Sequence, residues 1–184
     1  SNKVFSIQLY IRKQFLNDLG LNFTVKPANV NEEYPSHLKG KDIALYIAKQ
    51  KASAFTKLNP NEIIITCDTI VWVENMALGK PENKDHAKEM LQQLSGKTHE
   101  VISAVCIKSN QKEQLFYDVT EVTFHSLNPL DILYYVETFK PFDKAGSYGI
   151  QEWIGLIGIE KINGSYTNVV GMPMEKLYNE LMKW

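Results

Sequence analysis

The sequence predicts an α/β fold with a mixed central sheet flanked by helices, and two observations carry this prediction. Helical and strand-like hydrophobic periods alternate from one end of the chain to the other, as they do where helices cover a sheet. An apolar, β-branched run at residues 63–73 lacks the alternation of a strand with one wet face, so we expect it at the centre of the sheet. The length of 184 residues and the lack of a linker-like tract predict one domain, residues 1–184, that is two-lobed.

Hydrophobic spacing, caps and turn residues place the individual elements. Gly20 and the Asn59-Pro60 pair end the first two helices, and Asn83 and Asn128 cap the next two. A polar loop between two alternating runs predicts a hairpin. Helices are expected at residues 12–19, 41–58, 83–95, 128–138 and 174–184. Strands are expected at residues 22–26, 63–73, 99–108, 114–124 and 155–162.

Composition and charge exclude several classes of protein. Hydrophobic residues make up 44% and charged residues 22%, a globular balance unlike that of disordered chains. A formal net charge of -1 gives no global reason to bind nucleic acid or an anionic membrane, so phosphate recognition must be local. Cys67 and Cys106 lie in apolar stretches without metal-ligand spacing, which predicts buried free thiols. No segment has the pattern of a membrane span or a signal peptide, so we expect a cytoplasmic protein.

Asp68 is the first candidate for function because it lies within the apolar run. An ionised carboxylate in a buried strand is costly unless a cation, a metal, hydrogen bonds or a proton compensates it. The alternative is that Asp68 stands where the strand emerges and only caps a neighbouring helix. Open α/β sheets bind ligands at the carboxyl ends of strands, so an acid at that point also favours a site.

Two lysines and one loop are further candidates, each with a plainer alternative. Lys51 interrupts an apolar helical row, and its ammonium either reaches a cleft or extends to solvent. Lys80 lies between Gly79 and Pro81, where either the backbone approaches a ligand closely or the chain makes an ordinary surface turn. The loop at residues 143–151 combines a cation, two glycines, hydroxyls and an amide, which suits anion binding and the reading of a base edge, or a tight structural loop. The histidines are scattered, and we interpret them as surface or packing residues.

These candidates belong to a longer series of stretches that stand in the order seen in one protein family. Asp68 lies in Cys-Asp-Thr-Ile-Val (67–71), and Lys80 lies in Leu-Gly-Lys-Pro (78–81). The series as a whole resembles the Maf family, known also as septum-formation-inhibitor proteins, over about residues 14–181. The matching stretches are residues 31–35, 46–52, 67–71, 78–81, 94–99, 143–151 and 164–173.

The resemblance implies a fold and a reaction. Members of the Maf family are nucleotide pyrophosphatases with a two-lobed α/β fold, containing a cleft, that is related to the fold of the inosine triphosphatases. The implied reaction is hydrolysis of a nucleoside triphosphate between its α and β phosphates, which yields the monophosphate and pyrophosphate. By this likeness Asp68 is the catalytic acid that orients or deprotonates water, and Asp68 and Glu32 hold Mg²⁺ or Mn²⁺. Lys51 and Lys80 match other active-site positions, and a homodimer is compatible with the family, whose members often form dimers.

The likeness also implies a choice of base. The branch of the family that acts on dTTP and UTP carries Thr directly after the catalytic Asp and Gln at the end of the Tyr-Gly-Ile-Gln stretch, and this chain has Thr69 and Gln151 there. The branch that prefers 7-methyl-GTP differs at both positions. We therefore expect hydrolysis of dTTP and UTP, with modified pyrimidine triphosphates as further candidates. The residues expected to bind the substrate are Arg12, Glu32, Lys51, Thr69, Lys80, Lys144 and Gln151.

The first residues depart from the family pattern. The family begins with a strand followed by Ser-x-Ser-Pro-Arg-Arg, a phosphate-binding turn at a helix N-terminus. This chain reads Leu9-Tyr10-Ile11-Arg12 at that place, and only Arg12 matches, as the second arginine. Either phosphate binding is weakened, or the sequence lacks residues of this loop. The departure leaves open a catalytically impaired relative that binds nucleotide and regulates cell division through a partner, and a 7-methyl-GTP-type pyrophosphatase is a third alternative.

Overall fold

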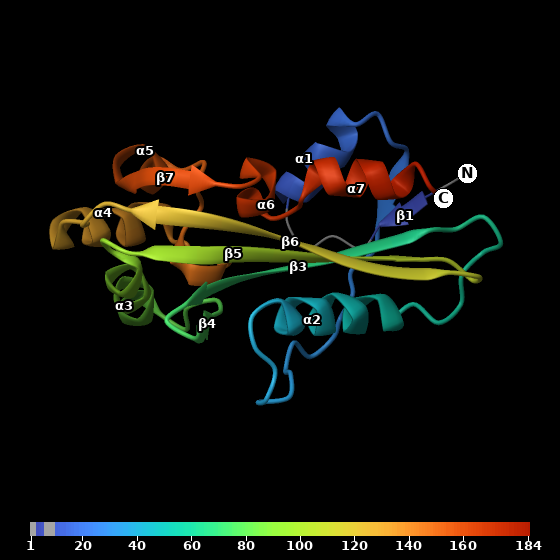
Figure 1. The fold of residues 1–184 in the computed structure, drawn as a ribbon, viewed down its shortest axis with the longest axis horizontal. Helices are drawn as coiled ribbons and strands as arrows, with labels where there is room; N and C mark the ends of the chain where they lie inside the picture. Colours follow the sequence, from blue (N-terminus) through green and yellow to red (C-terminus); the bar gives the residue numbers. More distant parts are fainter. Residues whose placement is uncertain (1–2, 6–9) are drawn as a thin grey trace.

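The computed structural model describes residues 3–5 and 10–184, with the side chains of residues 12–184. Three long antiparallel strands run along the molecule and form the centre of its sheet (Figure 1). They are β3 (Ile64–Val73), β5 (Thr98–Lys108) and β6 (Glu113–Phe124). Every residue of β3 except Thr69 and Trp72 is buried, which confirms the prediction of a central strand.

Short strands extend the sheet on both sides and make it mixed. β1 (Lys3–Phe5) runs parallel to both β2 (Phe23–Val25) and β3. β4 (Met76–Leu78) and β7 (Ile159–Asn163) run antiparallel to β3 and β6, respectively. The order among the described strands is β2-β1-β3-β5-β6-β7, and β4 pairs with the far end of β3. The structure therefore confirms an α/β fold with a mixed central sheet.

Helices cover the sheet in two groups, one in each half of the molecule (Figure 1). In one half α2 lies on one side of the long strands, and α1 and α7 lie on the other. In the other half α3, α4 and α5 surround the ends of these strands, and α6 lies between the two groups. This arrangement gives the two lobes that the sequence predicts. The helices are α1 (Tyr10–Asp18), α2 (Lys41–Ser53), α3 (Lys84–Leu94), α4 (Pro129–Phe139), the 3-10 turn η1 (Ala145–Ser147), α5 (Trp153–Gly158), α6 (Tyr166–Val170) and α7 (Met174–Leu181).

Each group of helices buries an apolar face against the sheet. Ile43 and Ile47 of α2 pack with Ile102 of β5, while Leu16 of α1 and Leu177 of α7 belong to a separate cluster on the strands. A third cluster joins α3, α4 and the ends of the long strands in the other lobe. Burial of one such side chain contributes about 1.5–3 kcal/mol, so these contacts hold α2 firmly on β3 and β5.

The two predicted helix caps and the two predicted buried thiols are confirmed. Asn83 caps α3 by accepting from the backbone N–H of His86, and Asn128 caps α4 by accepting from that of Leu130. Cys67 and Cys106 are both buried free thiols. No helix in the part of the chain that the structure describes is long and apolar enough to cross a membrane.

The predicted helix at residues 41–58 is too long, because α2 ends at Ser53. The Nζ of Lys108, in β5, donates to the carbonyls of Ala52 and Phe55 at 3.4 and 3.2 Å. These carbonyls lie at and beyond the helix end, where backbone acceptors lack helical partners. A contact with a distant strand therefore ends the helix before Asn59-Pro60.

The predicted strand at residues 155–162 is wrong in its first half. Residues Trp153–Gly158 form α5, and β7 begins only at Ile159. A Cβ placed at Gly155 would lie 1.8 Å from the carbonyl oxygen of Ile150, so only glycine allows this helical turn to close on the preceding loop. This close local packing against Ile150 overrides the strand-like alternation of the segment.

Candidate active site

On one edge of β3, the strands that the structure describes leave the middle of β3 unpaired. β1 pairs with Ile64 and Ile65, and β4 pairs with residues 71–73. Among the described strands none pairs with the stretch between them on that edge, while β5 pairs along the other edge. A cavity of about 520 Å³ is lined by this stretch, by α2 and β4, and by residues of the segments 143–151 and 169–171. Side chains from both faces of the sheet therefore reach one cavity.

Asp68 and Thr69 are neighbours in β3 and project to opposite faces, as successive strand residues do. Asp68 contacts Lys51 of α2, whereas Thr69 contacts Ser103 and Gly171 on the other face. Asp68 lies in the middle of β3, which differs from the strand end where open α/β sheets usually bind ligands. Among the described residues, the site therefore lies beside the stretch of β3 between β1 and β4, and not at the strand end.

Lys51 reaches Asp68 because α2 is fixed against β3 one turn earlier. Thr66, two residues before Asp68 on the same face of β3, donates to the carbonyl of Ala48 at 2.6 Å. The ammonium of Lys51 lies 2.9 Å from Oδ1 of Asp68 and 3.2 Å from Oε1 of Glu32. Lys51 is 3% exposed and Asp68 is 7% exposed, so their ion pair is buried at the wall of the cavity. Of the two alternatives for Lys51, the structure supports the one in which it reaches a cleft.

The surroundings of Asp68 change its acidity. Burial raises the pKa of Asp68 above its ordinary value, and the carboxylate of Glu32 acts in the same direction. The ammonium of Lys51 and the guanidinium of Arg12 oppose this shift, Lys51 more strongly. A carboxylate with a raised pKa is a better proton acceptor than one in water, so the position suits a general base.

Lys80 reaches the cavity from the turn after β4. Its Nζ lies 3.9 Å from Oε2 of Glu32, and its side chain is half exposed. The preceding residue, Gly79, accepts a hydrogen bond from the backbone N–H of Gly146 at 3.1 Å. This bond joins the Lys80 turn to the loop at residues 143–151, so the two predicted loops form one wall.

The loop at residues 143–151 is held by two aromatic hydroxyls. The backbone N–H of Gly149 donates to Oη of Tyr135 at 3.1 Å, and Oη of Tyr148 lies 2.6 Å from Nε2 of the buried His99. These contacts place Lys144 and the exposed Gln151 on the cavity wall. The loop is therefore tightly structured, as one of the two alternatives expects, and it also presents side chains to the cavity.

Arg12 lies on the Thr69 side of the cavity and is 4% exposed. Its Nε donates to the carbonyl of Gly171 at 2.8 Å, its Nη1 to that of Cys67 at 3.2 Å, and its Nη2 to Oγ1 of Thr69 at 3.1 Å. Arg12 therefore holds Thr69 and the segment around Gly171 together. Leu9 lies outside the described residues, as do the side chains of Tyr10 and Ile11.

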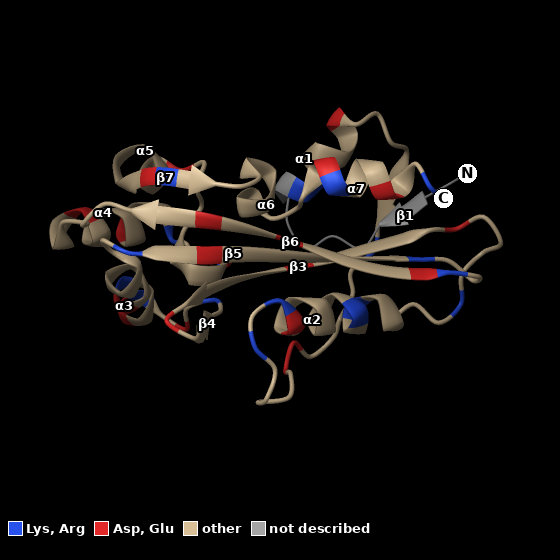
Figure 2. Ribbon diagram, viewed as in Figure 1, with Lys and Arg blue, Asp and Glu red and all other residues tan. Residues whose placement is uncertain are grey.

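The structure brings together every residue that the sequence predicts for the site. The residues of this set that line the cavity are Arg12, Glu32, Lys51, Asp68, Thr69, Lys80, Lys144 and Gln151. Sequence reasoning missed Ser103, which contacts Thr69, and assigned no role to Gly171. Gly171 stands in a stretch that matches the family, whereas Ser103 is only a small hydroxyl residue in an apolar strand. Acidic and basic residues are spread over both lobes (Figure 2), so the lysines at the cavity are a local feature.

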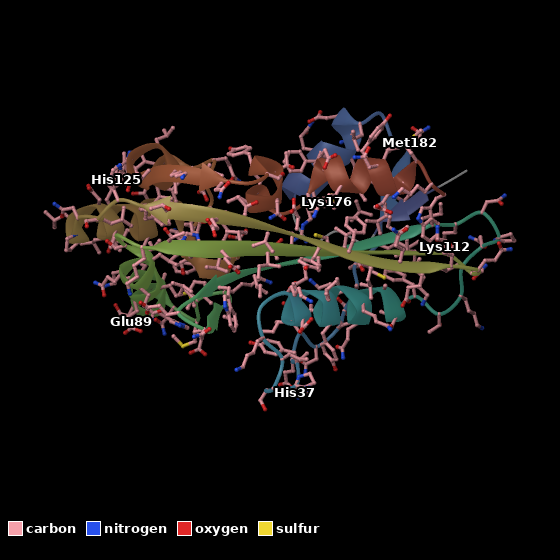
Figure 3. The ribbon with its side chains drawn as sticks, viewed as in Figure 1. His37, Glu89, Lys112, His125, Lys176 and Met182 are labelled. Carbon is pink, nitrogen blue, oxygen red and sulfur yellow. The ribbon has the colours of Figure 1, made fainter. Side chains whose placement is uncertain are left out.

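The donors in the cavity fit a metal ion that is shared with a substrate. Within the described chain there is no group of three or more His, Cys, Asp or Glu residues able to hold a metal ion. His37 and His125 lie at distant points of the molecule (Figure 3), as expected for scattered histidines. Asp68 and Glu32, however, both approach Nζ of Lys51, at 2.9 and 3.2 Å. Mg²⁺ is usually bound by one or two carboxylates together with substrate phosphates. Asp68 and Glu32 can provide the two carboxylates.

Comparison with known proteins identifies the family. The family model described as "Maf-like protein" matches residues 10–184, which is nearly the whole chain. The chain belongs to the Maf family. The Maf match begins at residue 10, so it includes Arg12 and excludes Leu9.

Relatives of the chain carry names that state an enzymatic activity. A protein of Phocaeicola vulgatus named dTTP/UTP pyrophosphatase is 51% identical over 174 residues, which cover 94% of this chain and 90% of that protein. A protein of the same name from Flavobacterium psychrophilum is 53% identical over 172 residues, covering 93% of this chain and 88% of that protein. The solved structure of a HAM1 protein from Coxiella burnetii aligns with a TM-score of 0.53 at 15% identity, covering 100% of this chain and 99% of that one. This last similarity concerns the fold alone.

Proposed function

We propose that the chain is a nucleoside triphosphate pyrophosphatase that hydrolyses dTTP and UTP to the monophosphate and pyrophosphate. The observation that carries the proposal is the buried ion pair of Asp68 and Lys51, with the partly exposed Glu32 beside Lys51, at the wall of a cavity large enough for a nucleotide. The names of relatives about half identical to this chain support the same reaction. The proposed substrate is a free nucleotide and not nucleic acid, and we expect the enzyme in the cytoplasm.

In this proposal Asp68 acts as the general base. Its carboxylate holds a water molecule and takes the proton as the water oxygen attacks phosphorus, and the bond to the leaving pyrophosphate breaks. The raised pKa of Asp68 favours this proton transfer, and the contact with Lys51 fixes the direction of the carboxylate. Burial excludes bulk water, so the fixed charges act on the reacting atoms in a medium of low dielectric constant.

Three lysines provide positive charge for the polyphosphate. Lys51, Lys80 and Lys144 reach the cavity from α2, from the turn after β4 and from the loop before α5. Each already has a carboxylate within 4 Å. Lys51 lies near Asp68 and Glu32, Lys80 near Glu32, and Lys144 near Asp143 and Glu152. A triphosphate that enters therefore finds cations that are already oriented, which is the main requirement for phosphoryl-type catalysis.

Asp68 and Glu32 are the residues that would hold a divalent metal ion, Mg²⁺ or Mn²⁺. When bound, such an ion neutralises charge on the phosphate oxygens and polarises the phosphorus centre. The two carboxylates lie on the same side of the cavity as Lys51 and Lys80, so phosphate oxygens and carboxylates meet there.

The base is proposed to bind in the part of the cavity that lies between Thr69 and Gln151, both of which line it. The side-chain amide of Gln151 can donate and accept at once, which suits the alternating carbonyl and imide groups of thymine and uracil. The surrounding wall is apolar and includes Val101, Val169 and Val170, against which a planar ring can pack.

The experiment that tests this function is release of pyrophosphate from a panel of triphosphates with Mg²⁺ or Mn²⁺. We expect turnover of dTTP and UTP, weaker turnover of CTP, and none of 7-methyl-GTP. A panel that includes 5-methyl-UTP measures tolerance for modified pyrimidines. Absence of pyrophosphate release from every nucleotide, together with nucleotide-dependent thermal stabilisation, would instead support the binding protein without turnover that the altered residues 9–12 suggest.

A further inference from the structure

The hydroxyl of Thr69 is held by a second hydroxyl that lies behind it in the sheet. Thr69 and Ser103 are directly opposite each other in β3 and β5, so their side chains share one face. Oγ1 of Thr69 lies 2.7 Å from Oγ of Ser103. Ser103 is fully buried and does not line the cavity, whereas Thr69 does. Ser103 therefore does not touch a ligand itself and can affect one through Thr69.

The direction of the hydrogen bond between these two hydroxyls follows from their other partners. Oγ of Ser103 lies 3.1 Å from the carbonyl oxygen of Asn168, which can only accept. If Ser103 donates its one proton to the carbonyl of Asn168, then the oxygen of Ser103 must accept the proton of Thr69. The reverse order would send the proton of Thr69 to the carbonyl of Gly171 over a longer distance, 3.3 Å. The first order is favoured, because it satisfies both the 2.7 Å contact between the hydroxyls and the 3.1 Å contact with the carbonyl of Asn168; in this order the proton of Thr69 is used within the protein.

Asn168 is a rigid anchor for this chain of hydrogen bonds. Its side-chain Nδ2 donates to the carbonyl of Val101 at 3.1 Å and to Oγ1 of Thr120 at 3.0 Å. Its backbone N–H donates to Oγ of Ser165 at 3.2 Å, and the residue is fully buried. The carbonyl that receives the proton of Ser103 is thus fixed by contacts to both β5 and β6.

Arg12 completes the arrangement around Thr69. Its Nη2 donates to Oγ1 of Thr69 at 3.1 Å, and a guanidinium cannot accept. In the favoured order the Thr69 oxygen donates to Ser103 and accepts from Arg12. This leaves one lone pair for the cavity, so Thr69 meets a ligand as an acceptor and not as a donor.

We propose that Ser103 is a positioning residue for base selection, which acts by keeping the Thr69 hydroxyl in the acceptor role. This inference rests on the proposed function, in which a pyrimidine base binds beside Thr69. Thymine and uracil carry a donor, the N3–H of the imide, where cytosine carries an acceptor. An acceptor-only Thr69 therefore favours uracil and thymine over cytosine, because cytosine would leave two acceptors facing each other.

The test compares equilibrium binding of UMP and CMP by calorimetry in wild-type protein, Ser103→Ala and Ser103→Thr. Product monophosphates are used because their binding can be measured whether or not the protein hydrolyses triphosphates. We expect wild type to prefer UMP, and Ser103→Ala to lower the UMP:CMP affinity ratio on the order of five- to tenfold, the size of one neutral hydrogen bond. Ser103→Thr keeps the hydroxyl and is expected to keep the ratio.

Thr66→Val is the matched control, because it removes another fully buried hydroxyl from the same sheet without touching Thr69. It is expected to lower stability and leave the UMP:CMP ratio unchanged. If Ser103→Ala does not fold, Ser103→Cys gives the same comparison with a weak hydrogen-bonding group of similar shape. An unchanged ratio in the variant that lacks the hydroxyl overturns the inference, as does a wild type without preference for UMP. Failure of the proposed function is a different result, namely UMP-selective binding without pyrophosphate release from UTP.

Discussion

The ammonium of Lys51 lies 2.9 Å from Oδ1 of Asp68, and both residues are almost completely buried. Two charges removed from water stabilise each other only as long as both are present. Loss of either one leaves an uncompensated charge at the wall of the cavity. The chemistry of Asp68 and the presence of Lys51 are therefore coupled, and the coupling can be measured.

Replacement of Lys51 by methionine tests its role directly. Lys51→Met keeps the length of the side chain but removes the cation that orients Asp68 and faces the polyphosphate. We expect kcat for UTP to fall on the order of 10²–10³-fold, as when one preorganised donor is lost from an active site. Lys49→Met is the matched control, because Lys49 lies on the same helix with a side chain 57% exposed. Steady-state kinetics should show near wild-type activity for Lys49→Met, and equal losses in both variants would contradict the assignment.

The pH dependence of activity follows from the raised pKa of Asp68. The carboxylate must be ionised to accept a proton, so activity is lost as the pH falls through this pKa. The acid midpoint of kcat/KM is therefore expected above the ordinary value for aspartate, about 3.9. Lys51→Met removes the main charge that lowers the pKa of Asp68. The acid midpoint of kcat/KM in this variant should therefore move to higher pH. A midpoint that moves to lower pH in this variant would rule out Asp68 as the titrating base.

Gly146→Ala tests whether the loop at residues 143–151 shapes the cavity. Gly146 has a φ of +68°, and a Cβ there would lie 2.8 Å from Cγ2 of Val71. Gly20 has a φ of +73° with nothing within 4 Å, so Gly20→Ala carries the backbone strain without the clash. We expect Gly20→Ala to lower the free energy of unfolding by about 1–2 kcal/mol. Gly146→Ala should lower it by about 1–3 kcal/mol more, because of the overpacking, and should also raise KM for UTP.

The two glycine variants are compared by chemical denaturation and by steady-state kinetics. Gly20→Ala is expected to leave KM unchanged, since Gly20 follows α1 and does not line the cavity. Equal losses of stability, with unchanged KM in both variants, would show that the contact of Gly146 with Val71 does not shape the site.

His99 makes the stability of the fold depend on pH. Burial lowers the pKa of His99 from 6.5 to about 4, so the folded protein keeps this imidazole neutral where the unfolded chain would protonate it. Its contribution to stability is present above pH 6.5 and is lost as the pH falls towards 4. The full loss is about 3 kcal/mol.

A variant that cannot titrate at this position measures the effect. His99→Gln retains a group able to hydrogen-bond with Tyr148, and His37→Gln is the control at an exposed position. Between pH 7 and pH 4 the free energy of unfolding of wild type should fall by about 3 kcal/mol more than that of His99→Gln. If the free energy of unfolding depends on pH in the same way in wild type and His99→Gln, His99 does not titrate with a lowered pKa.

The sequence predicts those parts of the site that depend on periodicity. Lys51 occupies the row of Ile43 and Ile47 on α2, so its place on the inward face follows from helical spacing. Asp68 stands out because a charge in a fully buried strand requires compensation. Both expectations are confirmed by the 2.9 Å contact between them.

Other features depend on contacts between distant segments, which spacing does not reveal. Among the described strands, β1 and β4 pair on either side of the middle of β3, and the site lies beside that stretch and not at the strand end. The end of α2 depends on Lys108, which lies in β5. Ser103 has no local signal, since its role comes from its register opposite Thr69.

Arg12 illustrates how a family motif and the structure complement each other. Ile11 stands where the family pattern has the first arginine of the phosphate-binding turn. The remaining Arg12 contacts the carbonyls of Cys67 and Gly171 and the hydroxyl of Thr69, all within the protein. Its observed contacts thus organise the base side of the cavity, while the proposed phosphate contacts come from Lys51, Lys80 and Lys144.

The most direct test of the central claim is pyrophosphate release from UTP by wild type and Asp68→Asn, measured with Mg²⁺ or Mn²⁺ at neutral pH. Asparagine has nearly the shape of aspartate but cannot take up the proton of water. We predict pyrophosphate release by wild type, and a loss of kcat on the order of 10²–10⁴-fold in Asp68→Asn while the protein remains folded. Turnover of UTP by folded Asp68→Asn at the wild-type rate would contradict the account.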